Sequence, residues 1–136
     1  MTKIAIDVGG VLIAKKHQDG QDTNFDPDDI KWLPGAIEAV RTLVTQGHEC
    51  YILSFCGKKT EEETRVALHK EIAVSIPENR WIFTRKREHK LREMEKLGIT
   101  ILIDDSDDII QLIRQNNRTG ILFHTWANVM GDHFSQ

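Results

Sequence analysis

Acidic residues follow two short apolar runs in the chain, and their side chains are the ones best suited to chemistry. Asp7 comes directly after residues 4–6, and the pair Asp104 and Asp105 comes directly after residues 99–103. A short apolar run of this kind is typical of a strand buried on both faces, as in a parallel sheet. Open α/β sheets bind ligands at the carboxyl ends of their strands. The sequence therefore predicts that these carboxylates converge on a divalent cation; the alternative is that each Asp only begins a turn.

The two acidic segments resemble the first and last motifs of the haloacid dehalogenase-like (HAD) superfamily of phosphotransferases. In that family the first motif is a strand followed by Asp-x-Asp-x-(Thr/Val), and the last is a strand that ends in Asp-Asp or Gly-Asp. The corresponding stretches here are Asp7-Val-Gly-Gly-Val11 and Asp104-Asp105. The resemblance covers nearly the whole chain and implies a compact, capless, magnesium-dependent phosphatase.

The resemblance also implies roles for the acidic residues. Asp7 would attack the phosphoryl group to give an aspartyl-phosphate, which splits one difficult transfer into two easier ones. Mg²⁺ would be held by Asp7, by the backbone carbonyl of Gly9 and by the pair Asp104 and Asp105, since this cation takes oxygen ligands. The sequence leaves open which member of the pair binds the metal directly.

Two further motifs of the family have counterparts along the chain. Its second motif is a Thr or Ser at the end of the next strand, where it binds the phosphate, and Ser54 matches it. Its third motif is a Lys ahead of the last strand; Lys90 matches it best, with Lys86 as the competitor. Gly10 is expected beside the phosphate, because glycine lets the backbone pass close to a ligand.

Gly9 departs from the pattern of typical HAD phosphatases, which carry a second Asp at this position. In those enzymes that Asp protonates the leaving group and then activates water, a role worth roughly 10²–10⁴ in rate. Gly9 has no side chain to perform it. The sequence therefore leaves an alternative to the enzyme: a binding protein of HAD fold that holds a phosphorylated ligand without turnover.

The elements that must position these residues alternate along the chain. Apolar patterns predict strands at 4–6, 50–54, 81–84, 99–103 and 120–123. They also predict helices before Gly47, at 60–72, at 86–97 and from a Ser106 cap to about 116, followed by a packed tail that includes Trp126 and Phe134. Repeated β-α units imply a Rossmann-like, three-layer α/β/α sandwich with a mainly parallel five-stranded sheet.

The spacing of these elements predicts a single domain, 1–136, with no cap domain. The two places where HAD enzymes insert a cap correspond to residues 15–33 and 56–85, and both are too short to hold one. In the first of them, Asp26 and Pro27 are expected to begin a turn or short helix, with Asp26 as the cap. An open site of this kind suits a macromolecular substrate, or a small one enclosed by a partner subunit.

Composition limits the classes of partner. The net charge is −3 over 136 residues, so neither general nucleic-acid binding nor membrane attraction is expected. No apolar run reaches the roughly 18 residues that a membrane span needs, and the N-terminus lacks a signal-peptide pattern. Cys50 and Cys56 have no metal-site spacing, which favours reduced thiols and a cytoplasmic location. The expected partner is a phosphorylated substrate, whether a nucleotide or a macromolecule, and the oligomeric state is left open.

Overall fold

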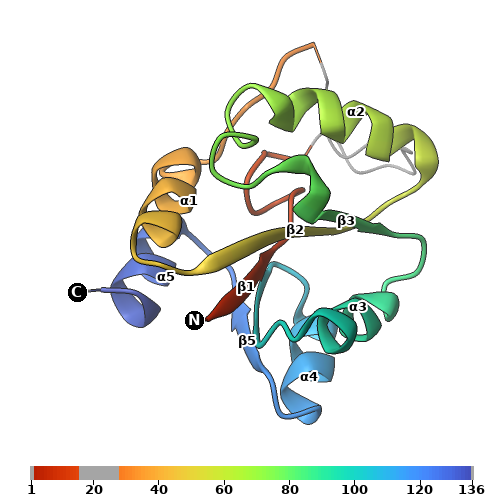
Figure 1. Ribbon diagram of the computed structural model, residues 1–136, viewed down its shortest axis with the longest axis vertical. Helices are drawn as coiled ribbons and strands as arrows, with labels where there is room; N and C mark the ends of the chain where they lie inside the picture. The colour runs from red at the N-terminus through yellow and green to blue at the C-terminus, as the bar shows by residue number, and fades with distance from the viewer. Residues whose placement is uncertain (1, 16–27, 136) are drawn as a thin grey trace.

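The computed structural model describes residues 2–15 and 28–135 and shows a sheet of five strands between two layers of helices (Figure 1). Within this part of the chain the elements follow one another in the order β1 (Lys3–Ile6), α1 (Ala36–Thr45), β2 (Glu49–Phe55), α2 (Lys58–His69), η1 (Glu78–Arg80), β3 (Trp81–Thr84), α3 (His89–Leu97), β4 (Ile101–Asp104), α4 (Asp107–Gln115), β5 (Thr119–Leu122) and α5 (Trp126–His133). The predicted α/β class is confirmed.

The sheet is parallel throughout, with the strand order β3-β2-β1-β4-β5. β1 is therefore the central strand. β2 and β3 are added in turn on one side of it, and β4 and β5 on the other. The border between β1 and β4 is the point at which the order of construction reverses. In sheets of this type the crevice at such a point, at the carboxyl ends of the strands, is where ligands bind.

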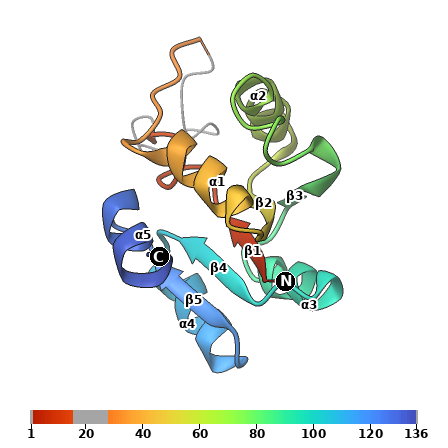
Figure 2. The same cartoon turned by 60° about the vertical axis from the view of Figure 1, so that its left-hand side comes forward.

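Two apolar clusters lie on the two faces of the sheet. One face carries α1, α2 and α5, whose side chains join those of Ile4 and Ile6 in the larger cluster. The other face carries α3 and α4, which pack with Ala5 and Leu102 in the smaller one. The alternation of Ile4, Ala5 and Ile6 between the faces follows from the two-residue period of a strand. Burial on both faces explains why these strands are almost wholly apolar. Figure 2 shows the two layers from a second direction.

Some helix boundaries differ from those predicted. α3 begins at His89 instead of residue 86, because residues 85–88 form turns. α2 ends at His69, short of residue 72, and turns follow it. Ser106 does precede α4, but its hydroxyl makes no cap bond; its backbone N–H instead donates to Asp104 Oδ1 at 3.0 Å. The segment before α4 is thus tied to the end of β4.

The C-terminal tail, expected to pack against the body, does so as the helix α5. Thr125 caps it by accepting a hydrogen bond from the backbone N–H of Asn128 at 3.1 Å. Trp126 is buried, and its indole N–H donates to the Val11 carbonyl at 2.7 Å. This bond ties the tail to the loop that follows β1. A buried indole needs such a partner, since an unpaired buried donor is costly.

Between β2 and β3 the chain contains α2, turns and η1, and no further domain. Of the segment between β1 and α1, residues 16–27 lie outside the described part, and with them the turn predicted at Asp26 and Pro27. Ile13 bridges Trp32 in antiparallel fashion, so the two ends of this segment lie side by side. In the described part of the chain, no helix combines the length and apolar character that crossing a membrane requires.

Candidate active site

Asp7 and Asp104 lie side by side at the carboxyl edge of the sheet. Ile6 is paired with Ile103 in the β1–β4 register, so the residue that follows each of them is a carboxylate. The backbone N–H of Asp7 donates to the Ile103 carbonyl at 3.0 Å, which fixes the relative position of the two acids. Both are buried. The sheet therefore forces two negative charges together at the switch point between β1 and β4.

Lys90, in the first turn of α3, reaches between these two carboxylates. Its ammonium lies 2.7 Å from Asp104 Oδ2 and 3.2 Å from Asp7 Oδ1, and its side chain is only 4% exposed. Lys86, the competitor from the sequence, is exposed in the preceding turn and does not line the cleft at this site. The structure therefore places Lys90, rather than Lys86, at the acidic cluster.

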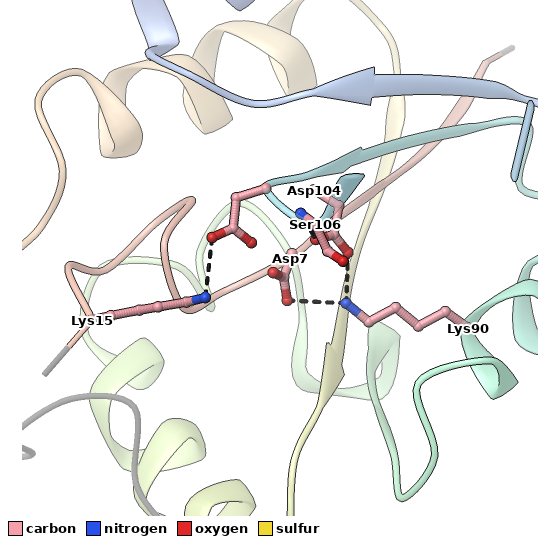
Figure 3. Close-up of polar contacts among 6 residues, drawn as sticks. Asp7, Lys15, Lys90, Asp104 and Ser106 are labelled. Carbon is pink, nitrogen blue, oxygen red and sulfur yellow. Dashed lines mark hydrogen bonds and ion pairs between the residues drawn. The ribbon is translucent and has the colours of Figure 1, made fainter. Parts of the chain in front are cut away.

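Asp105 is the third carboxylate of the cluster, and a second lysine pairs with it. The Lys15 ammonium lies 3.1 Å from Asp105 Oδ2. Figure 3 shows Lys15 and Lys90 approaching the carboxylates from opposite sides. Lys15 was not among the residues singled out from the sequence. It belongs to the loop after β1, whose spacing carries no motif for a lysine.

The three carboxylates fit a divalent cation. Asp7, Asp104 and Asp105 each offer an oxygen, and these oxygens lie within 4.8 Å of one another. Hard cations such as Mg²⁺ prefer ligand sets of this chemistry. Asp104 already accepts from Lys90 and from the Ser106 N–H, whereas Asp105 is partly exposed and pairs with Lys15. Asp105 is thus the member of the pair with more freedom to take a metal.

The electrostatics of the cluster show a surplus of negative charge. The pKa of Asp7 is raised to about 7: burial raises it most, Lys90 lowers it, and the Asp104 and Asp105 carboxylates raise it again. Burial alone would lower the pKa of Lys90, but Asp7 and Asp104 outweigh it, and the net shift is upward. Lys90 is therefore cationic at neutral pH, while Asp7 is easily protonated. Further positive charge beside Asp7 would lower its pKa.

A cleft of about 240 Å³ opens above this cluster. Ser54, which is buried near the end of β2, lines it, so the structure brings this predicted residue to the same cleft as Asp7. Among residues 2–15 and 28–135, the lining consists of Asp7, Gly9, Lys15, Ser54, Phe55, Arg87, Lys90, Asp104, Asp105, Ser106 and Ile109. Phe55, Arg87 and Ile109 were not predicted. Phe55 and Arg87 are immediate neighbours of predicted positions, but neither residue type has a motif that would single it out.

The two glycines after Asp7 differ in what they contribute. Gly9 lines the cleft, and its carbonyl accepts no backbone hydrogen bond from the described residues, so it is free to face a ligand. Gly10 does not line the cleft, and its N–H donates to the Ile13 carbonyl at 2.9 Å. Its φ of +81° suits glycine, and a Cβ there would overlap the Asp105 carboxylate. Gly10 thus makes room for Asp105 and has no free N–H for a phosphate.

Comparison with known proteins identifies solved structures of similar fold. No protein-family model matches the sequence, and no curated protein matches it. Solved structures do match the fold. D,D-heptose 1,7-bisphosphate phosphatase from B. bronchiseptica, complexed with magnesium and phosphate, superposes with a TM-score of 0.66 over 88% of this chain and 79% of its own, at 16% identity. The class C acid phosphatase from Bacillus anthracis superposes with a TM-score of 0.60 over 99% of this chain and 74% of its own, at 14% identity.

A structure of the Pnkp1/Rnl/Hen1 complex also matches, with a TM-score of 0.67 over 89% of this chain, at 16% identity. This chain covers 44% of that one. The fold is that of HAD phosphatases. The resemblance found in the sequence is therefore confirmed for the HAD fold. At these low identities the likeness concerns the fold, and the chemistry must be argued from the side chains of this chain.

Proposed function

We propose that this protein is a magnesium-dependent phosphatase that acts through an aspartyl-phosphate on Asp7. The observation that carries the proposal is the buried Asp7 carboxylate, held at the end of the central strand between Lys90 and two further carboxylates. The phosphatases of similar fold, one of them complexed with magnesium and phosphate, support the reaction class. The substrate is a phosphorylated compound, and nucleotides, small phosphoesters and phosphorylated ends of macromolecules are the candidates.

Asp7, Asp105 and the Gly9 carbonyl would hold Mg²⁺, with Asp104 beside them. The fit rests on the three carboxylates, whose oxygens lie within 4.8 Å of one another. The bound cation supplies positive charge that lets an anionic phosphate approach an anionic nucleophile. It would also lower the pKa of Asp7, which in its absence is raised to about 7 mainly by burial.

The residues of this chain then act in a fixed order. One oxygen of Asp7 forms a bond to phosphorus while the bond from phosphorus to the leaving oxygen breaks. Lys90 and the Ser54 hydroxyl donate to the oxygens of the transferred group and so stabilise the charge that develops on them. Water then attacks the aspartyl-phosphate, which releases inorganic phosphate and restores the Asp7 carboxylate. Lys90 already contacts Asp7, so it needs little rearrangement to follow the transfer.

The experiment compares phosphatase activity with and without Mg²⁺ in wild type, Asp7→Asn and Asp108→Asn. Asp108 is exposed in the first turn of α4 and does not line the cleft, so its variant is the matched control. We expect activity that requires Mg²⁺, persists in Asp108→Asn and falls by at least about 10³-fold in Asp7→Asn. Activity that survives intact in Asp7→Asn would exclude the aspartyl-phosphate route.

Gly9 favours one alternative, a phosphate-binding protein without turnover, because no side chain at this position can protonate the leaving group. Gly9→Asp tests it with one aryl and one alkyl phosphate. In an enzyme, the wild type should hydrolyse the aryl phosphate faster, since its leaving group needs the acid least. Gly9→Asp should then raise the alkyl rate by up to roughly 10²–10⁴. In a binding protein, both forms would be silent toward both compounds and would still bind them.

A further inference from the structure

Three cationic side chains line the cleft, and two of them have carboxylate partners. Lys90 pairs with Asp7 and Asp104, and Lys15 pairs with Asp105. Arg87 has no acidic partner within the described ranges 2–15 and 28–135. Its guanidinium instead lies over the ring of Phe55, 5.8 Å from the ring centroid. Counting only the described residues, the cleft therefore contains one cation whose hydrogen-bond donors are free for a ligand.

Phe55 is also unusual for its position. It follows Ser54 directly on β2 and is 38% exposed, whereas most large apolar side chains of the described residues are buried. The apolar core does not need it, yet it lines the same cleft as Asp7. Phe55 and Arg87, which we call the rim pair, thus lie next to the residue expected to bind the phosphate. They come from different elements, the end of β2 and the turn before α3.

The two residues before Arg87 are also basic, but neither of them lines the cleft. Arg85 is fixed, because its guanidinium donates to Glu61 Oε1 at 2.8 Å and to the Cys56 carbonyl at 3.3 Å. Lys86 is exposed and does not line the cleft. Of these three consecutive basic residues, one is structural, one faces solvent, and Arg87 alone faces the cleft.

We propose, on the basis of the function proposed above, that the rim pair is the subsite for the leaving group. Arg87 binds a second anionic group of the substrate, a phosphate or a carboxylate, and Phe55 packs against the atoms that join it to the reacting phosphoryl group. Asp7 and its partners Asp104 and Lys90 are buried, whereas the rim pair is exposed, so a substrate with its phosphoryl group at Asp7 can extend past this rim. A planar guanidinium with free donors suits carboxylate and phosphate oxygens, which it binds with two parallel hydrogen bonds.

The test uses two aryl phosphates of nearly equal size, 3-carboxyphenyl phosphate and 3-carbamoylphenyl phosphate, which differ in charge at one group. A third, 3-phosphonophenyl phosphate, distinguishes a phosphate-like from a carboxylate second anion. Each is measured in steady-state hydrolysis and, in parallel, by calorimetric binding with Mg²⁺ to Asp7→Asn and to Asp7→Asn combined with Arg87→Gln. The proteins compared are otherwise wild type, Arg87→Gln, Phe55→Ala and the matched control Lys86→Gln.

Wild type should prefer the carboxylate over the carboxamide by about fivefold in kcat/KM, mainly through KM. Arg87→Gln should reduce this ratio to about one, and Lys86→Gln should keep it. Phe55→Ala should raise KM for all three compounds alike. A preference unchanged in Arg87→Gln, or lost equally in Lys86→Gln, would overturn the subsite.

The binding measurement separates this proposal from the proposed function. Hydrolysis that does not depend on Arg87 would contradict the proposed subsite and support the proposed phosphatase activity. Binding that depends on Arg87, without hydrolysis by the wild type, would support the subsite and contradict the phosphatase activity. Neither binding nor hydrolysis of any of the three compounds would contradict both.

Discussion

Two clusters of charged residues at neighbouring positions of the molecule are built in opposite ways. The first, the cleft cluster, is mostly buried and contains three carboxylates and two ammonium groups: Asp7, Asp104, Asp105, Lys15 and Lys90. The second, the α2 cluster, is partly exposed and contains one carboxylate between two guanidinium groups: Glu61, Arg65 and Arg85. The first has a surplus of negative charge and the second a surplus of positive charge.

The pKa of the central carboxyl group in each cluster, Asp7 or Glu61, reflects this difference in charge. Burial is the largest influence on both and raises the pKa of each. For Glu61 the two arginines outweigh burial, and the net pKa is lowered. For Asp7 the single lysine, Lys90, does not outweigh burial, because Asp104 and Asp105 oppose its effect, and the pKa is raised to about 7. A buried, unbalanced charge is costly to maintain, which is the reason that the cleft cluster is suited to a cation.

The largest effect should come from removing the lysine that holds the cleft cluster together. Lys90→Met leaves Asp7 and Asp104 facing each other without a buried cation. We expect the free energy of unfolding of the metal-free protein to fall by about 3 kcal/mol at pH 8. Phosphatase activity should also be lost. Urea unfolding measures the first effect; Mg²⁺ should restore part of it, and Lys86→Met is the control, expected within about 0.5 kcal/mol of wild type.

A second prediction concerns pH, and its sign follows from Asp7. Its pKa in the folded protein is about 7, above the ordinary value of 3.8 for this group. The stability that this shift contributes is fully present below the unfolded pKa and is lost as pH rises through about 7. Between about pH 6 and pH 8 the metal-free protein should lose about 1 kcal/mol from this group, and Mg²⁺ should bind more tightly at the higher pH.

Asp7→Asn is the control for that titration. The variant cannot ionise at this position, so its stability should change less over the same pH range. Chemical unfolding at several pH values measures both proteins. An equal pH dependence in the two proteins would mean that another group is responsible.

A smaller effect is expected from the second cation of the cleft cluster. Lys15 lies 3.1 Å from Asp105 Oδ2 and would have to give way if Asp105 bound the metal as proposed. Lys15→Met should therefore tighten Mg²⁺ binding, by about two- to fivefold for a partly exposed ion pair. Calorimetry with Mg²⁺ measures this. Lys31→Met is the control, because Lys31 is exposed and pairs with Asp29 outside the cleft. Weaker binding in Lys15→Met would contradict the displacement.

The fold could be predicted from the sequence because its signals are local. Short apolar runs between turn residues indicate buried parallel strands, and acids directly after such runs fall at one edge of the sheet. Asp7 and Asp104 lie at this edge for that reason, and the pairing of β1 with β4 makes them adjacent. Ser54 and Lys90 could be assigned through the resemblance to the HAD motifs, which place a Ser or Thr at the end of the second strand and a Lys ahead of the last one, and the structure brings both to the cleft.

The remaining parts of the site could not be predicted, because they depend on contacts between distant elements. Lys15 reaches Asp105 from a loop without periodicity, across the space that Gly10 leaves open. The basic residues 85–87 lie just before α3. Their composition looks helical, yet α3 begins only at His89, and Arg85 is held by Glu61 of α2. Tertiary contacts of this kind override local propensity, and they also decide that Arg87 faces the cleft.

The smallest effect should come from the α2 cluster. Glu61→Gln removes the carboxylate between Arg65 and Arg85, which lie 2.9 Å and 2.8 Å from it. Since both arginines are partly exposed, we expect a loss of at most about 1 kcal/mol at neutral pH. The pKa of Glu61 is lowered in the fold, so its contribution is present above the unfolded pKa and disappears as pH falls through the folded one.

Magnesium binding decides whether the two clusters are independent. In Glu61→Gln it should stay within about twofold of wild type, because sites without shared partners have nearly additive effects. Arg85 connects the two clusters, since it precedes Arg87 in the turn that leads to Lys90. If Glu61→Gln altered Mg²⁺ affinity as much as Lys15→Met does, the α2 cluster would have to be regarded as support for the cleft. The contrast between a partly exposed cluster with surplus positive charge and a buried one with surplus negative charge would then no longer hold.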